Sequence, residues 1–230
     1  MKHKKWITAV LIVVLLLFTG AILAAANRDR IRTVFDLSRE QSKIKDNSGS
    51  VIALVGGAPI YESAIKKWEL SYEFNNAQLE NALTEATSDE AKLFIAGRID
   101  ETKHKTENQK RAEIIDRLVQ KEKLLQFCPS VGIQVSDEEA DAYQAELEAA
   151  FQKLIESGNE SLKGMEDFME QQRLGSGLSE EEYQKLLREG YREQLLYQRL
   201  YEYYENHNPD QLSYQDWWAE QTADIPVVLY

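Results

Sequence analysis

The feature that most restricts this sequence is an uncharged apolar run near its start. Residues 6–26 read WITAVLIVVLLLFTGAILAAA, 21 residues without a charged side chain. A helix needs about 20 apolar residues to cross the hydrocarbon core of a bilayer. Lys2, Lys4 and Lys5 precede the run, and such a positive flank stays in the cytoplasm. The run therefore predicts a transmembrane signal anchor at residues 1–26, with everything after it outside the cytoplasm.

A cleaved signal peptide is the alternative interpretation of this run. Signal peptides also begin with basic residues, but their apolar core spans roughly 7–15 residues and ends at a small-residue cleavage site. Residues 24–26, all alanine, supply such a site. The length of the run favours the uncleaved anchor. Both interpretations predict an extracytoplasmic domain, on the cell membrane or secreted, and Cys128 is too far from the run to carry a lipid.

Charge and cysteine content exclude several classes of protein. Three of the 27 Lys+Arg lie in residues 1–5, so 24 basic side chains face 39 acidic ones from Asn27 onward, a net charge of −15. Nucleic-acid binding needs a basic face and is not expected. One cysteine allows no intramolecular disulfide and no multi-cysteine zinc site, and the three histidines are far apart in the sequence. We therefore expect no catalytic, cofactor-binding or metal-binding residues.

Two short strands are predicted at opposite ends of the part beyond the anchor. Residues 51–55 are apolar and precede Gly56-Gly57, a tight-turn signal that leads into a second, very short strand at residues 59–60. Residues 225–230 also read as a strand. Neither end is stable as an isolated strand, so we expect residues 51–55 to pair with residues 225–230. Pairing within one chain and exchange between two chains are both compatible with the sequence.

From Glu62 almost to the end, the apolar spacing is that of helices. A capping box satisfies two free backbone donors at a helix start, and the sequence has three of them. Pro129 is expected to end the helix that contains Cys128, because proline disfavours helix in the residue before it. The predicted helix starts are Ser88, Thr106 with Gln109, Ser136 with Glu139, Ser179 with Glu182, and Ser213, and the predicted breaks are residues 157–159 and 175–177.

Residues 51–60, with a helix starting at Glu62, resemble the opening hairpin of SurA-type chaperone domains. In that family the hairpin has a short apolar strand, Asn-Gly, a small residue, proline or similar, isoleucine, and a capping threonine. This chain departs from the pattern at two positions. Gly56 replaces the asparagine, and Tyr61 stands where threonine or serine is usual. Both departures affect local geometry and not the fold.

The middle of the chain carries the more specific resemblance. Residues 115–125 read IDRLVQKEKLL, and residues 131–139 read VGIQVSDEE. Together they are similar to the family's run of paired leucines and isoleucines followed by Gly-Ile-x-Val-Ser-Asp-Glu-Glu. Residues 177–183, GLSEEEY, resemble a later helix start of the same family. The resemblance covers residues 51–204.

The resemblance implies a mainly α fold within the SurA, PrsA and trigger factor superfamily of peptide-binding domains. The expected organisation is a transmembrane segment at residues 1–26, a tether at 27–50 with one short helix around 31–37, and a multi-helix SurA N-terminal-like chaperone domain at 51–230. The two terminal strands would form its small β element. PrsA-like relatives add a parvulin prolyl-isomerase domain, for which the 26 residues after Tyr204 leave no room, so an enzyme is not expected.

The expected function is that of a membrane-tethered extracytoplasmic chaperone, a holdase for unfolded or newly secreted polypeptides. A non-catalytic adaptor that binds one envelope protein is the alternative. The aromatic residues of the C-terminal part either hold clients or pack the core, so substrate-binding residues, client identity and oligomeric state stay open. These aromatic residues are Tyr191, Tyr197, Tyr201, Tyr203, Tyr204, Tyr214, Trp217, Trp218 and Tyr230.

Other chemistry-bearing residues have structural interpretations. The acidic runs 137–139 and 180–182 fall in predicted first turns of helices, where the helix dipole favours negative charge. Cys128 lies on an apolar helix face and is expected to be a small core residue. His104 and His207 lie in polar stretches and are expected to face solvent.

Overall fold

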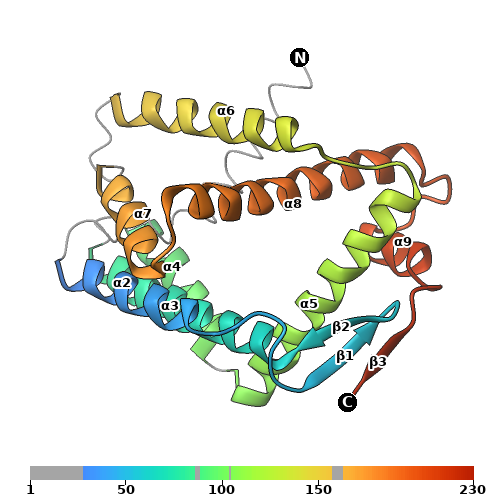
Figure 1. The fold of residues 1–230 in the computed structure, drawn as a ribbon, viewed down its shortest axis with the longest axis horizontal. Helices are drawn as coiled ribbons and strands as arrows, with labels where there is room; N and C mark the ends of the chain where they lie inside the picture. Colours follow the sequence, from blue (N-terminus) through green and yellow to red (C-terminus); the bar gives the residue numbers. More distant parts are fainter. Residues whose placement is uncertain (1–27, 86–88, 104, 157–162) are drawn as a thin grey trace. The chain divides into compact units, whose positions relative to one another are not determined.

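The computed structural model describes residues 28–85, 89–103, 105–156 and 163–230, and it is mainly helical with one small three-stranded sheet (Figure 1). The predicted anchor, the cap at Ser88, His104 and the break at residues 157–159 lie outside these residues. Within them, no helix combines the length and the apolar character that crossing a membrane requires. Among the residues that the structure describes, the chain divides into two compact units. The first takes in residues 28–43, 68–85, 89–103, 105–109, 152–156 and 163–177, and the second residues 44–67, 110–151 and 178–230.

The described part of the first unit is almost entirely helical. It contains α2 (Arg28–Ser42), α4 (Asp89–Lys103), α7 (Lys163–Ser176), the part of α3 (Glu62–Glu85) that follows Lys67, the first three residues of α5 (Glu107–Ser130) and the last five of α6 (Asp137–Glu156). On α4, Ile95 and Ile99 are buried against Leu79 and Leu83 of α3, as the apolar spacing of both segments predicts.

Helix α2 is longer than the short helix predicted around residues 31–37, and it packs against α7. Val34 is buried, with 3% of its surface exposed. The approach of the two helices is close at Gly175, because a Cβ there would fall 2.4 Å from the carbonyl oxygen of Phe35. A predicted tether segment thus contains a helix with a specific packing partner.

The sheet of the second unit brings the hairpin at residues 51–61 next to the C-terminal strand. Strands β1 (Val51–Val55), β2 (Ala58–Tyr61) and β3 (Val227–Leu229) lie in the order β2-β1-β3, both pairs antiparallel (Figure 1). Ala53 lies opposite Leu229, which confirms the predicted pairing of the terminal strands. Gly56 and Gly57 connect β1 to β2 with φ angles of 56° and 89°. Two positive φ angles are typical of a type I′ hairpin turn, and only glycine adopts both without strain.

Four helices complete the second unit. Two of them, α5 and α6, also have a few residues that belong to the first unit. They are α5 (Glu107–Ser130), α6 (Asp137–Glu156), α8 (Glu180–Asn206) and α9 (Tyr214–Gln221). Val119 of α5 packs under the sheet, against Ala53, Val55 and Ile60. The largest buried cluster of this unit lies where α5, α8 and α9 meet. Its members are Leu124, Phe127, Cys128, Ile133, Leu196, Leu200 and Trp217.

The three predicted capping boxes are present. In each box, the hydroxyl of the N-cap residue accepts a hydrogen bond from the backbone N–H of the residue three positions later. The Gln or Glu side chain of that later residue accepts a hydrogen bond from the backbone N–H of the N-cap residue. The pairs are Thr106 with Gln109, Ser136 with Glu139, and Ser179 with Glu182. Ser213 caps α9 in the same manner by accepting from the amide of Asp216.

The helix end predicted at Pro129 is wrong, since α5 continues through Pro129 to Ser130. The residue that closes the helix is instead Gly132, which lies two positions after Ser130 and whose φ of 80° is in the left-handed region. Ile133 donates to the carbonyl of Cys128 at 2.8 Å, and Gly132 donates to that of Pro129 at 3.2 Å. This pair of bonds is a Schellman motif, which satisfies the last carbonyls of a helix. Pro129 lies in the last turn, where it lacks only a backbone N–H donor. Its carbonyl still accepts the hydrogen bond from Gly132.

Candidate functional site

The C-terminal aromatic residues form two layers, of which the inner one belongs to the core. Phe127 of α5 is contacted edge-on by Trp217 and Trp218 of α9, with ring centroids 6.2 and 5.3 Å apart. Only 2% of Trp217 is exposed, and its indole N–H donates to the carbonyl of His207 at 3.2 Å. Tyr191 is also buried. For these residues the core-packing alternative is correct.

The outer layer is a set of four tyrosines that we call the tyrosine face: Tyr197, Tyr201, Tyr204 and Tyr214. The ring of Tyr201 lies 5.6 Å from that of Tyr204 and 5.9 Å from that of Tyr214. Tyr197 and Tyr201 are one helical turn apart on α8, so their side chains share one side of the helix. They expose 41% and 39% of their surfaces. The face therefore offers aromatic surface to solvent over a buried aromatic base.

Two phenols of the tyrosine face, those of Tyr197 and Tyr214, have raised pKa values and are neutral at physiological pH. Burial raises the pKa of Tyr197 to about 12, and that of Tyr214 to about 12 as well. Tyr204 is fixed by its hydroxyl, which donates to the carbonyl of Leu212 at 2.8 Å. The surface is accordingly apolar, with polar edges, and the rings of Tyr201, Tyr204 and Tyr214 contact one another.

Acidic side chains accompany the tyrosine face in the sequence. Residues 200–230 carry six carboxylates and neither lysine nor arginine. All six are exposed, and none forms an ion pair with a residue that the structure describes. Glu205 follows Tyr201 by one helical turn, which places the two on one side of α8. The six are Glu202, Glu205, Asp210, Asp216, Glu220 and Asp224.

Aromatic rings and free carboxylates together favour one class of ligand. Ring faces attract lysine and arginine through their quadrupole and also contact apolar side chains without a demand for particular sequences. Uncompensated carboxylates raise the local concentration of cationic segments. The arrangement suits polypeptide segments that are apolar and basic.

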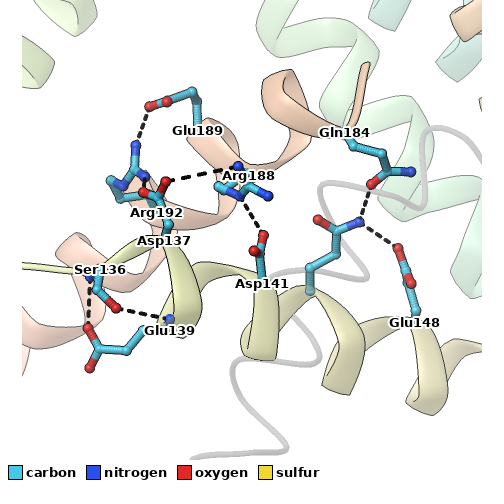
Figure 2. A network of polar contacts seen from close by, with 10 residues as sticks. Ser136, Asp137, Glu139, Asp141, Glu148, Gln184, Arg188, Glu189 and Arg192 are labelled. Atoms are coloured by element: carbon cyan, nitrogen blue, oxygen red, sulfur yellow. Dashed lines mark hydrogen bonds and ion pairs between the residues drawn. The ribbon is translucent and has the colours of Figure 1, made fainter. Parts of the chain in front are cut away.

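A second polar region joins α6 to α8 within the second unit (Figure 2). Arginines on α8 face acidic residues on α6: Arg188 lies 2.5 Å from Asp141, Arg192 pairs with Asp137, and Arg199 lies 2.5 Å from Glu139. We call these three contacts the ion-pair seam. The acidic run 137–139 thus serves the first turn of α6 and its packing on α8, as its structural interpretation predicts.

Beside the seam, two side chains of α6 make partly buried polar contacts with α8. Gln144 is buried, and its amide donates to Gln184 at 2.7 Å and to Glu148 at 2.8 Å (Figure 2). The hydroxyl of Tyr143 accepts from the amide of Gln198 at 3.0 Å. Apolar contacts accompany these polar ones: among the described side chains of α6, Ala140 is fully covered and the ring of Tyr143 contacts that of the buried Tyr191 edge-on at 6.0 Å. The ion pairs add to this packing a contribution that weakens with salt and with acid.

The remaining candidates for chemistry have ordinary surroundings. Cys128 is fully buried, and burial raises the pKa of its thiol to about 11. His207 is exposed, as predicted, and its ring stacks on Tyr203 with centroids 3.9 Å apart. No group of His, Cys, Asp or Glu in the described part of the chain is arranged to hold a metal ion.

No family model, no characterised protein and no solved structure matches this chain. The site therefore rests on geometry alone. Sequence reasoning named all four members of the tyrosine face but not their separation from the buried Trp217 and Tyr191, which depends on the packing of α9. It missed the acidic segment, for which counting charges over residues 200–230 is the signal.

Proposed function

We propose that this chain is a membrane-tethered extracytoplasmic chaperone of the holdase type, which binds unfolded or newly secreted polypeptides and has no catalytic domain of its own. The observation that carries the proposal is the tyrosine face, three of whose four members lie in the acidic segment 200–230, which contains no lysine or arginine. Unfolded polypeptides expose apolar and basic side chains together. Aromatic surface holds the apolar ones with little sequence preference, and carboxylates attract the basic ones.

The resemblance of residues 51–204 to the SurA N-terminal domain supports the same proposal. A domain of that family would open with a hairpin, continue as helices and close with a strand that returns to the first one. Here β1 and β2 open the domain and β3 pairs with β1. Tethering through residues 6–26 is part of the proposal, since it would place the tyrosine face outside the membrane, where exported chains emerge.

Suppression of aggregation tests this function. The full chain in lipid nanodiscs would be added to two unrelated, chemically unfolded proteins, whose aggregation after dilution is followed by light scattering against empty nanodiscs. We expect near-stoichiometric suppression of both. Tyr201→Ser should weaken it several-fold, because it removes an exposed ring from the tyrosine face.

The matched control is Leu186→Ser on the same helix. Leu186 is 56% exposed, more than Tyr201, but it lies outside the tyrosine face. If both variants suppress aggregation as well as the unchanged chain does, the tyrosine face is not the binding surface. If the unchanged chain suppresses neither protein, the holdase function is wrong.

An adaptor for one envelope protein is the second candidate, and the fixed geometry of the rings favours it. Tyr204 is anchored by a hydrogen bond and contacted edge-on by Tyr214 at 5.3 Å. Preorganised aromatic anchors are typical of interfaces with one defined partner. An adaptor would leave both aggregation reactions unchanged and would bind one envelope protein in a fixed ratio.

A further inference from the structure

The outer edge of β3 presents unpaired backbone groups. Tyr230 donates to the carbonyl of Ile52 at 2.9 Å, and Gly56 donates to that of Pro226 at 2.8 Å. In an antiparallel pair these contacts alternate along the strand, so Val228 also faces β1. Val227 and Leu229 consequently direct their N–H and C=O groups away from β1, and no described residue bonds to those groups.

The side chains of β3 are apolar and open to solvent. Val227 and Leu229 lie opposite Val55 and Ala53, so they project from the same face of the sheet. Val55 and Ala53 are fully buried, whereas Val227 and Leu229 are 39% and 64% exposed. The apolar layer of this face thus continues onto β3 without the cover it has at β1.

The opposite edge of the sheet is protected in the ordinary way. Strand β2 contains an exposed proline, Pro59, and its pairing with β1 shifts register between Val51 and Ala53. Prolines, bulges and charges are the devices by which proteins prevent edge-to-edge pairing. Residues 225–230 contain no charge, and Pro226 directs its nitrogen toward β1 and not outward. Strand β3 is very short, which is itself such a device, but its edge has no outward proline, no bulge and no charged side chain and so stays open to pairing.

We propose that β3 pairs antiparallel with β3 of a second copy of this chain, about a two-fold axis that passes beside Val228. Val227 would then lie opposite Leu229 of the second copy, and Leu229 would lie opposite Val227 of the second copy. Each of the two pairs exchanges two backbone bonds, so all outward groups of Val227 and Leu229 are used. The exposed side chains of both copies meet on one sheet face and cover each other. Such an isologous contact needs no other sequence than the one β3 itself supplies.

Charge is compatible with this contact although the chain is acidic. The nearest acidic side chain is that of Asp224, and the two-fold axis places the copies of Asp224 at opposite ends of the paired strands. At ~3.3 Å per residue, the eight residues between them correspond to roughly 26 Å, beyond the ~8 Å screening length at physiological ionic strength. The rest of the two acidic domains repel each other more weakly as salt rises, so we expect pairing to strengthen with salt. With three residues from each copy, the interface is smaller than that of stable dimers. We therefore expect the paired and unpaired chains to interconvert.

Disulfide trapping in the full chain tests the register. Val228 would face Val228 of the second copy as a non-hydrogen-bonded pair, with Cα atoms ~4.5 Å apart, a distance that a disulfide spans. Leu229 would be ~8 Å or more from Leu229 of the second copy, which is too far. Under mild oxidation we expect Val228→Cys to give at least five-fold more covalent dimer than the matched control Leu229→Cys. The unchanged chain has only the buried Cys128 and should give none.

A proline at position 227 supplies the second arm. The N–H of Val227 points outward, so Val227→Pro removes a pairing donor and leaves the bonds between β1 and β3 in place. Combined with Val228→Cys it should lower the cross-link several-fold, whereas Val227→Thr should retain it. Equal cross-linking of Val228→Cys and Leu229→Cys, or none at Val228→Cys, overturns the proposal. The proposal is also overturned if the Val228→Cys chain forms no disulfide with its own copies but forms one with an added cysteine-containing unfolded polypeptide. That result would make the edge of β3 a binding site for strands of other proteins. A failure to suppress aggregation would count against the tyrosine face as a binding surface, and it would not count against the pairing of β3.

Discussion

Gly56 lies directly against the side-chain amide of Gln126: a Cβ on Gly56 would fall 1.9 Å from its Oε1. Gln126 holds this position because its Nε2 donates to the carbonyl of Val55 at 2.7 Å. The hairpin turn and helix α5 are therefore fitted to each other, and glycine at position 56 satisfies both the positive φ and the close approach.

This contact predicts that Gly56→Ala destabilises the chain more than Gly57→Ala does. Both positions have positive φ, but a Cβ on Gly57 meets nothing within 4 Å. Moving Gln126 breaks its bond to Val55, so we expect an extra loss of about 1 kcal/mol in the free energy of unfolding for Gly56→Ala. Urea denaturation measures both. In a Gln126→Ala background the difference should vanish, and an unchanged difference there would contradict this explanation.

The ion-pair seam predicts a pH-dependent contribution from Glu139. The guanidinium of Arg199 and the backbone amide of Ser136 lower the pKa of this carboxyl. A lowered pKa in the folded state means that the contribution is present at neutral pH and is lost as the pH falls through the folded pKa. Glu139→Gln should therefore lower the urea midpoint at pH 7, and the difference from the unchanged chain should shrink toward about pH 3.

The control for this prediction is Glu146→Gln, also on α6. Glu146 is exposed and forms no ion pair with a described residue. Its substitution should leave the midpoint nearly unchanged at both pH values. A deficit of the Glu139 variant that persists at low pH would show that lost helix capping, and not the ion pair, accounts for it.

Local chemistry made much of the fold predictable. The capping boxes at Thr106, Ser136 and Ser179 involve partners three residues apart, so the sequence alone contains both halves of each contact. The pairing of β1 with β3 followed from a different argument, since a short strand at either end of a helical domain needs a partner. Pro129 misled because the stronger signal, Gly132, lies three residues further on.

Contacts between distant segments set the rest. The local sequence around Asp137 and Asp141 does not predict their contacts with Arg188 and Arg192, because the alignment of α6 with α8 depends on the packing of the whole unit. The same holds for the aromatic residues. Trp217 and Tyr201 look alike in the sequence, yet the docking of α9 buries the first and leaves the second partly exposed.

Burial predicts that the thiol of Cys128 is unreactive in the folded chain. With a pKa of about 11, roughly one thiol in a thousand is ionised at pH 8, and the side chain is fully covered. A thiol-reactive dye at pH 8 should label the folded chain orders of magnitude more slowly than the chain in denaturant. Val228→Cys, with its new thiol at an exposed position, is the positive control and should gain one fast-labelling group. Rapid labelling of the unchanged folded chain would contradict the buried position of Cys128.

Three phenols with raised pKa values predict a loss of stability in alkali. Burial raises the pKa of Tyr191, Tyr197 and Tyr214 to about 12, whereas a phenol in the unfolded chain ionises near pH 10. Between these values only the unfolded chain loses the proton. The stabilising contribution is therefore complete below about pH 10 and is lost as the pH rises toward 12. Tyr197→Phe removes one such phenol, so its free energy of unfolding should fall less steeply over this range, and Tyr197→Phe with Tyr214→Phe less steeply again. Chemical denaturation at several pH values measures the slopes, and equal slopes for all three chains would show that these phenols are as hydrated in the folded state as in the unfolded one.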